Sequence, residues 1–125
     1  MKERKNGFNS EELSRAIADG MSEKKGRDIV ILDLRGIQNA ITDFFVICTG
    51  NSDTQIDAIA DSVEETVLRQ TKEGAWHKEG FQNREWVLID YVNVVASIFK
   101  ENTREFYALE ELWGDAKTIE VLSEQ

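Results

Sequence analysis

Four short apolar runs constrain the fold of this chain more than any other feature of its sequence. The first lies in residues 28–34, where four apolar residues follow one another, as in a strand that is covered on both faces. Residues 40–50 contain the second run, and residues 84–91 and 94–99 are the third and fourth. Residues 75–81 are a shorter, mixed stretch that suits an edge strand. Helical patterns precede, separate and follow these runs, so the sequence predicts a single α/β domain with a mixed sheet flanked by helices.

Three helices are expected to pack around these strands. The first begins at Asn9 or Ser10, and the second begins at Ser52, where a short polar side chain can cap the helix. The third begins at Asn102, because Asn102 and Glu105 have the spacing of a capping box. The apolar residues of this third helix recur at helical spacing and are expected to form one face: Phe106, Leu109, Leu112 and Trp113.

Both ends of the chain are expected to lie outside the folded domain, which would span residues 10–116. Residues 1–9 carry three cationic side chains and little that can pack, so they are interpreted as a flexible N-terminus. Residues 117–125 are interpreted as a polar C-terminal tail, with local order around Ile119 and Leu122.

The charge balance narrows the partners that this chain can have. Its 125 residues include 24 Asp and Glu against 15 Lys and Arg, which gives a formal net charge of -9. Such a surface repels phosphate backbones, so no direct binding to nucleic acid is expected, whereas a basic protein partner suits it. The single cysteine, Cys48, excludes an intrachain disulfide and fits a reducing compartment. No stretch resembles a membrane span or a signal peptide, so a cytoplasmic protein without membrane contact is expected.

Few residues offer catalytic or metal-binding chemistry. His77 is the only histidine, and the partners of a catalytic triad are not evident around it. With one histidine and one cysteine, neither a metal site nor a cofactor is expected. The turn from Gly50 to Ser52 precedes a helix and could hold a phosphate, so the alternative function is a nucleotide-binding or nucleotidyl-transfer enzyme. That reaction needs two metals held by close carboxylates, but acid-x-acid spacing occurs nowhere in the sequence.

Aromatic residues gather in the second half of the chain, where they can either form the core or anchor an interface. In the third strand, Trp86 alternates with Leu88 and Asp90 on one face. At least one face of this strand is expected to be partly exposed. Glu79, Glu85 and Asp90 would give it an acidic rim, and this combination favours docking onto a basic protein.

Several motifs of the sequence match a known family in their order and spacing. They are DIVILD at 28–33, TDFFVICTGNS at 42–52, Ile56 with AIAD at 58–61, Glu79-Gly80, WVLIDY at 86–91 and REFYALEELWG at 104–114. With these motifs the chain resembles the ribosomal silencing factor family, RsfS or Iojap, across residues 13–113. It departs from the family pattern at Val92, where a glycine is usual, and at Ser97, where a histidine is usual.

The resemblance implies a nucleotidyltransferase-like fold that lacks the catalytic carboxylates, and hence no enzymatic activity. It also implies binding to the large ribosomal subunit through its protein fourteen. Docking there would sterically block joining of the small subunit and repress translation under nutrient limitation. When no ribosome is present, an exposed apolar sheet face could also pair with itself in a homodimer.

Eight residues on the last strands and the last helix are expected to contact the partner: Glu79, Trp86, Asp90, Tyr91, Ser97, Phe99, Arg104 and Tyr107. The aromatic members other than Tyr91 would be apolar anchors. The acidic members would pair with basic groups of the partner, whereas Arg104 would orient Tyr107 or a carboxylate.

Overall fold

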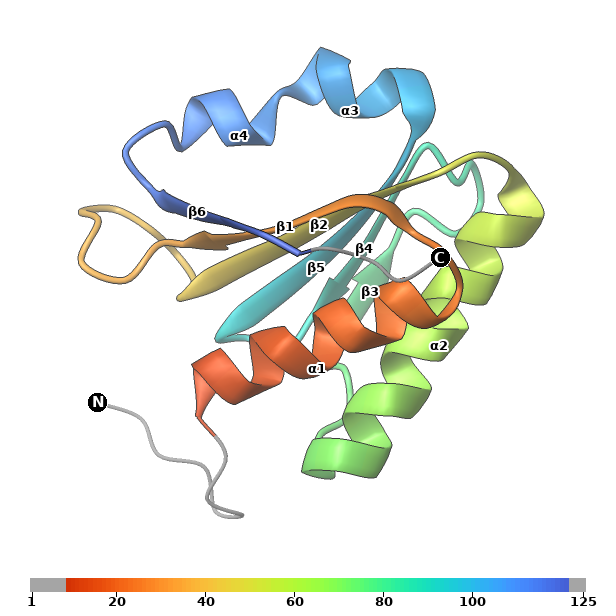
Figure 1. Cartoon of the computed structure of the whole chain (residues 1–125), viewed down its shortest axis with the longest axis horizontal. Helices are drawn as coiled ribbons and strands as arrows, with labels where there is room; N and C mark the ends of the chain where they lie inside the picture. The colour runs from red at the N-terminus through yellow and green to blue at the C-terminus, as the bar shows by residue number, and fades with distance from the viewer. Residues whose placement is uncertain (1–8, 122–125) are drawn as a thin grey trace.

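The computed structural model of the chain describes residues 9–121, which form a six-stranded mixed sheet between two layers of helices (Figure 1). The helices are α1 (Ser10–Glu23), α2 (Asp53–Thr71), α3 (Glu101–Tyr107) and α4 (Leu109–Leu112). The strands are β1 (Arg27–Asp33), β2 (Phe44–Gly50), β3 (His77–Glu79), β4 (Trp86–Asp90), β5 (Val94–Lys100) and β6 (Lys117–Glu120). The predicted α/β class, with a mixed sheet flanked by helices, is confirmed.

The sheet has the strand order β3-β4-β5-β2-β1-β6. Of the described strands, only β2 and β5 run parallel, and the other neighbours are antiparallel. These two strands lie at the centre and are buried along almost their whole length, which accounts for their unbroken apolar runs. β3 and β6 lie at the edges and are mostly exposed, so the edge strand expected within residues 75–81 is present as β3.

The start of α1 agrees with the sequence. The Asn9 side chain accepts a hydrogen bond from the Glu12 amide at 2.8 Å, and the Glu12 carboxylate accepts one from the Asn9 amide at 3.2 Å. This reciprocal pair is a capping box, which fixes the first turn of the helix. Residues 1–8, most of the expected flexible N-terminus, lie outside the described residues.

The C-terminal segment differs from the prediction that residues 117–125 form a polar tail. Lys117–Glu120 form β6, which pairs antiparallel with β1. Ile119 packs against the core while its neighbours in the strand are exposed. One apolar residue among polar ones is too weak an alternation to identify a strand, so only the partner strand reveals it. Residues 122–125 lie outside the described part of the chain.

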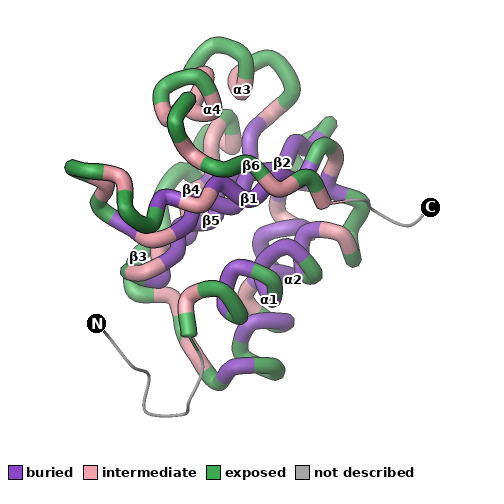
Figure 2. Tube along the Cα trace, turned by 60° about the vertical axis from the view of Figure 1, so that its left-hand side comes forward, coloured by how far each residue is buried: buried purple, intermediate pink, exposed green. Residues whose placement is uncertain are grey.

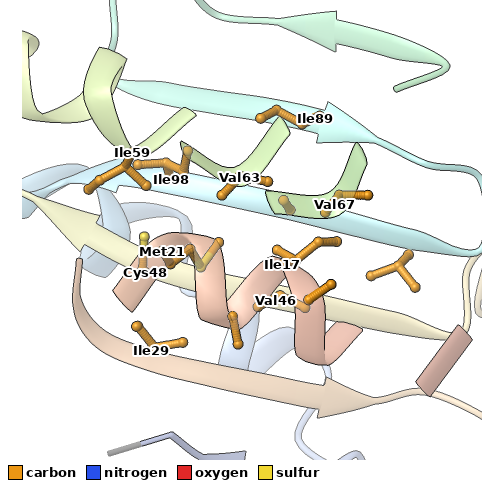
Figure 3. Close-up of a cluster of buried hydrophobic side chains, with 14 of the residues drawn as sticks. Ile17, Met21, Ile29, Val46, Cys48, Ile59, Val63, Val67, Ile89 and Ile98 are labelled. Carbon is orange, nitrogen blue, oxygen red and sulfur yellow. The ribbon is translucent and has the colours of Figure 1, made fainter. Parts of the chain in front are cut away.

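The face of the sheet that α1 and α2 cover holds the main core (Figure 3). Ile17 and Val63 from the helices meet strand residues such as Val46 and Ile98, and all four are buried. Cys48 lies in the same core, and burial raises the pKa of its thiol to about 12. The sulfur therefore stays neutral and packs as a small apolar group.

The opposite face of the sheet is covered by α3 and α4 (Figure 1). Its buried residues form a second cluster that includes Leu32, Ile47 and Phe99. Leu109 and Trp113 pack against this cluster but remain partly exposed. Within α3 and α4 themselves no residue is buried, whereas α1 and α2 each have a buried face (Figure 2). The second helical layer therefore gains little stability from apolar burial.

The last helix of the prediction is broken in two. Ala108, between α3 and α4, has a left-handed backbone with φ of 50°. The expected capping box of Asn102 and Glu105 is not formed, because Lys100 is the N-cap and no side chain bonds to that helix end. The break lets part of the predicted apolar face reach the sheet, but Leu112 stays 69% exposed. The prediction of one continuous apolar helix is therefore corrected.

The hairpin between β4 and β5 turns through Val92, whose φ of 77° is costly for a β-branched residue. Asp90 Oδ1 supports the turn by accepting a hydrogen bond from the Val92 amide at 2.7 Å. Replacing Val92 by glycine is expected to raise the free energy of unfolding by about 1 kcal/mol, because glycine adopts this conformation without steric cost. Urea denaturation measures the change. The control Val92→Ala keeps a Cβ atom and should gain less; a glycine variant no more stable than the parent chain would contradict the strain.

Candidate protein-docking site

Four aromatic side chains from two strands and a helix meet at the second face of the sheet. Trp86 and Phe99 are paired in register on β4 and β5, and their rings stack with centroids 4.9 Å apart. Tyr107 of α3 packs on Trp86 at 4.7 Å, and Phe106 meets Tyr107 edge-on at 5.1 Å. We call these four residues the aromatic cluster. Exposure rises along it, from buried Phe99 to Tyr107 at 47% and Phe106 at 80%, so its outer members are available to a partner.

Trp86 is held in place by the strand beside it. Its indole Nε1–H donates to Ser97 Oγ at 3.1 Å, which satisfies the polar edge of the ring. Ser97 and Phe99 are buried, because Trp86 lies over both of them. In this conformation neither residue can touch a partner, so their predicted contact role is corrected: they position Trp86 instead.

Tyr91 lies on the other side of the sheet from the aromatic cluster. It is buried in the main core with Val87 and Ile89, because alternation along β4 directs these residues toward α1 and α2. Its hydroxyl has no hydrogen-bond partner among the described residues. Burial, and to a lesser extent the charge of Glu64, raises the pKa of Tyr91 well above its usual value. The predicted contact through Tyr91 is therefore corrected.

A hollow of about 450 Å³ opens beside the aromatic cluster. Trp86, Phe106 and Tyr107 line it together with Glu85 and Thr103. Thr103 Oγ1 donates to Glu85 Oε1 at 2.7 Å, which holds the carboxylate at the hollow. We call this feature the aromatic hollow; its other lining residues are Gly80, Asn83 and Asn102.

The two acidic residues predicted to pair with basic groups lie along the β3–β4 edge. Glu79 stands opposite Leu88 in register, and Asp90 stands opposite His77. Glu79 Oε2 lies 2.7 Å from His77 Nε2, and Asp90 supports the β4–β5 hairpin. Neither residue lines the aromatic hollow, so the structure does not bring the predicted acids and the aromatic cluster into one pocket.

Arg104 ties the second helical layer to the sheet. From α3, its guanidinium donates to the Asp28 carbonyl oxygen at 2.8 Å and to Thr49 Oγ1 at 2.9 Å. It also donates to both carboxylate oxygens of Glu110 on α4, at 3.1 and 2.9 Å. The Arg104 side chain is only 13% exposed, so water competes little for these bonds. We call these four residues the arginine clamp; Glu110 is the carboxylate that Arg104 orients.

Of the lining residues of the aromatic hollow that were not among the predicted contact residues, Phe106 and Glu85 matter most for docking. Phe106 was assigned to the apolar face of a continuous helix, and its exposure accompanies the break at Ala108, for which the sequence carries no signal. Glu85 was expected only as part of an acidic rim. Its position next to Trp86 was the available signal, whereas the hydrogen bond from Thr103 joins residues that are distant in sequence.

In the turn from Gly50 to Ser52, which was considered as a phosphate site, side chains of the turn and of α2 already accept hydrogen bonds from backbone N–H groups. The backbone N–H of Asn51 donates to Gln55 Oε1 at 2.7 Å, and the backbone N–H of Gln55 donates to Ser52 Oγ at 3.1 Å. Gly50 packs against α2, where an added Cβ would lie 2.8 Å from Ile56 Cγ1. Within the described part of the chain, no group of three or more His, Cys, Asp and Glu is placed to hold a metal ion. No described helix is both long and apolar enough to cross a membrane.

The fold and this surface define a small α/β domain with a partly exposed aromatic cluster on one face of its sheet. The model of one protein family, described as RsfS, ribosomal silencing factor during starvation, matches residues 8–125. The match covers almost the whole chain, so the chain belongs to the RsfS family. The resemblance predicted from the sequence motifs is therefore confirmed.

Individual relatives support the same assignment. The ribosomal silencing factor RsfS of Halalkalibacterium halodurans is 39% identical over 114 residues, which cover 91% of this chain and 96% of the relative. That of Bacillus subtilis is 38% identical over 113 residues, which cover 87% and 91%. A crystal structure of a Chromobacterium violaceum protein matches with a TM-score of 0.79 at 28% identity, covering 93% of this chain and 95% of that one. Both named relatives are silencing factors, a regulatory class rather than an enzyme class.

Proposed function

We propose that this chain silences the ribosome by binding the large subunit through its protein fourteen and sterically blocking the joining of the small subunit. Translation would thereby be repressed under nutrient limitation. Membership of the RsfS family supports the silencing role. The main structural support for docking is the exposed pair Phe106 and Tyr107, backed by Trp86. Aromatic side chains on a packed support are typical anchors of protein interfaces.

The charge of the chain supports a basic protein as the partner. The net charge is -9, and Glu79, Glu85 and Asp90 lie on or beside the β3–β4 region. Acidic groups on the same protein steer a basic partner toward it and keep phosphate backbones away. The proposal places the activity in the cytoplasm and requires neither a metal nor a cofactor. Without ribosomes, the same apolar face would be free to pair with a second copy of the chain.

Sedimentation tests the proposal directly. The purified chain is mixed with isolated large subunits, small subunits are added, and the mixture is separated on a gradient. Co-migration with the large subunit and a smaller fraction of joined ribosomes is the expected result. Large subunits that lack protein fourteen are the control for the partner. Binding without loss of joining would reject steric occlusion, and no binding at all would reject the proposal.

Variants of the aromatic cluster test where the partner docks. Phe106→Ala and Tyr107→Ala are each expected to weaken large-subunit binding about tenfold, because each removes an exposed aromatic anchor. Leu68→Ala is the matched control, since Leu68 is also exposed but lies on α2, on the other side of the sheet. Titration by co-sedimentation measures the affinity, and circular dichroism verifies the fold. Unchanged binding by folded variants would remove the aromatic cluster from the docking site.

A further inference from the structure

We propose that the aromatic hollow binds one arginine side chain of the protein partner. This inference rests on the proposed function, since it assigns a chemical group of the partner to one part of the docking surface. It goes further than that function, because it names the residues that would recognise the group. Three features of the hollow support an arginine as its ligand: its rings, its carboxylate and the lack of a cation among its described lining residues.

The rings of the hollow suit a planar cation. Trp86, Phe106 and Tyr107 all line it, and each ring contacts the next within the cluster. Aromatic faces carry partial negative charge and attract cations within about 6 Å of the ring centre. A guanidinium also stacks flat on such rings, which an ammonium group cannot do. The indole N–H of Trp86 is already bonded to Ser97, so the hollow offers the ring of Trp86 and not its polar edge.

The hollow also holds a carboxylate with spare capacity for a cation. Glu85 Oε1 accepts one hydrogen bond from Thr103. The nearest cation to Glu85 is Lys100, whose Nζ lies 4.0 Å from Glu85 Oε2 but only 2.5 Å from Asp53 Oδ1. Lys100 therefore pairs mainly with Asp53, and the Glu85 carboxylate can still bind an incoming guanidinium. Among the described residues, no Lys, Arg or His lines the hollow.

A second hollow on the same side of the molecule shows the contrast. It measures about 520 Å³ and is lined by several acidic residues, including Glu101, Glu105 and Glu111. It contains two cations of its own, Arg27 and Arg104, and no aromatic ring among its described lining residues. Its acids are thus partly neutralised from within the chain. The aromatic hollow, by comparison, combines rings and a carboxylate and has no cation among its described lining residues, so its charge is complementary to a partner's arginine.

Binding of a small probe tests the recognition itself. N-acetyl-arginine amide is titrated into the isotopically labelled chain, and N-acetyl-citrulline amide, its neutral isostere, is the control. Arginine amide should shift the Trp86 Nε1–H resonance and bind about five- to thirtyfold more tightly than citrulline amide. Glu85→Gln should remove most of this preference, whereas Glu65→Gln, an exposed site on α2, should not. Equal response to both probes would overturn the inference.

Large-subunit binding by matched variants separates this inference from the proposed function. Phe106→Leu and Tyr107→Leu keep most of the apolar area but remove the rings, so a cation site predicts weaker binding by each variant. If both leucine variants and Glu85→Gln bind the large subunit as tightly as the parent chain does, the arginine site is overturned and the docking function stays intact. If the parent chain does not bind the large subunit but still prefers arginine amide over citrulline amide, the proposed function is rejected and the cation site is kept. A concentration-dependent dimer that these variants abolish would assign the hollow to a second copy and overturn the proposal.

Discussion

Arg104→Met is expected to lower the free energy of unfolding by about 2–3 kcal/mol and to release α3 and α4 from the sheet before the core unfolds. The substitution removes the hydrogen bonds to Asp28, Thr49 and Glu110 and leaves the Glu110 carboxylate without its cation. Methionine keeps the apolar stem of the side chain, so the loss comes from the guanidinium. Apolar burial cannot compensate, because no residue of α3 or α4 is buried.

Urea denaturation measures the total loss, and hydrogen exchange of the α3 amides detects the earlier release. Arg27→Met is the matched control, since Arg27 lines the second, acidic hollow together with Arg104. The Arg27 side chain is 41% exposed and contacts Asn51 and Glu101. Exposed pairs contribute little, so this control should cost less than about 1 kcal/mol. Equal destabilisation by the two variants would show that the arginine clamp does not hold the second layer.

The arginine clamp also links stability to docking. Phe106 and Tyr107 lie on α3, so release of this helix would separate them from Trp86. Arg104→Lys should restore only part of the stability, because an ammonium group lacks the planar fork that reaches both oxygens of Glu110. Partial recovery of subunit binding alongside stability is therefore expected for the lysine variant.

Local signals in the sequence predicted the central part of the fold well. The apolar run within residues 28–34 indicated a strand buried on both faces, and the run ending at Gly50 indicated a second strand; β1 and β2 lie there. Asn9 and Ser52 were predicted to begin helices, and each caps its helix in the structure. The caps were predictable because their hydrogen bonds join residues that are close in sequence. The strands were predictable because an unbroken apolar run is typical of a strand in the middle of a sheet.

Features that depend on distant partners could not be predicted in the same way. β6 exists because β1 offers it a pairing edge, although its own residues are largely polar. Ala108, where the helix breaks, lies between Arg104 and Glu110 in the sequence. These two side chains bond to each other across the break, and Arg104 also bonds to Thr49 of the sheet. Helix propensity alone favours a continuous helix through Ala108, so tertiary contacts overrule it here.

The sequence indicated which residue types the candidate site contains but not which of those residues are buried. Alternation along β4 separated Trp86 from Tyr91, yet it did not indicate which face the longer helices would cover. The same limit applies to Ser97 and Phe99, which lie on the docking side but beneath Trp86. Burial is a property of layers, and a single strand's pattern does not say how many side chains stack above it.

Gly80→Ala is expected to lower the free energy of unfolding by about 3 kcal/mol, more than backbone strain alone would cost. Gly80 has φ of 91° in the turn between β3 and β4, where an added Cβ would lie 2.0 Å from the Trp86 carbonyl oxygen. That oxygen belongs to β4, which is held in register by β5 and cannot easily yield. The turn must therefore move, and it will shift the lining of the aromatic hollow, to which both Gly80 and Trp86 belong.

Gly36→Ala separates the two causes of this loss. Gly36 also has a positive φ, of 84°, but an added Cβ there would have nothing within 4 Å, so its cost should be near 1 kcal/mol. Urea denaturation of both variants isolates the steric contact with Trp86 as the difference between them. Equal losses would mean that the β3–β4 turn relaxes freely. A larger loss for Gly80→Ala, together with a changed environment of the Trp86 indole, would show that the turn and the aromatic hollow are built as one unit.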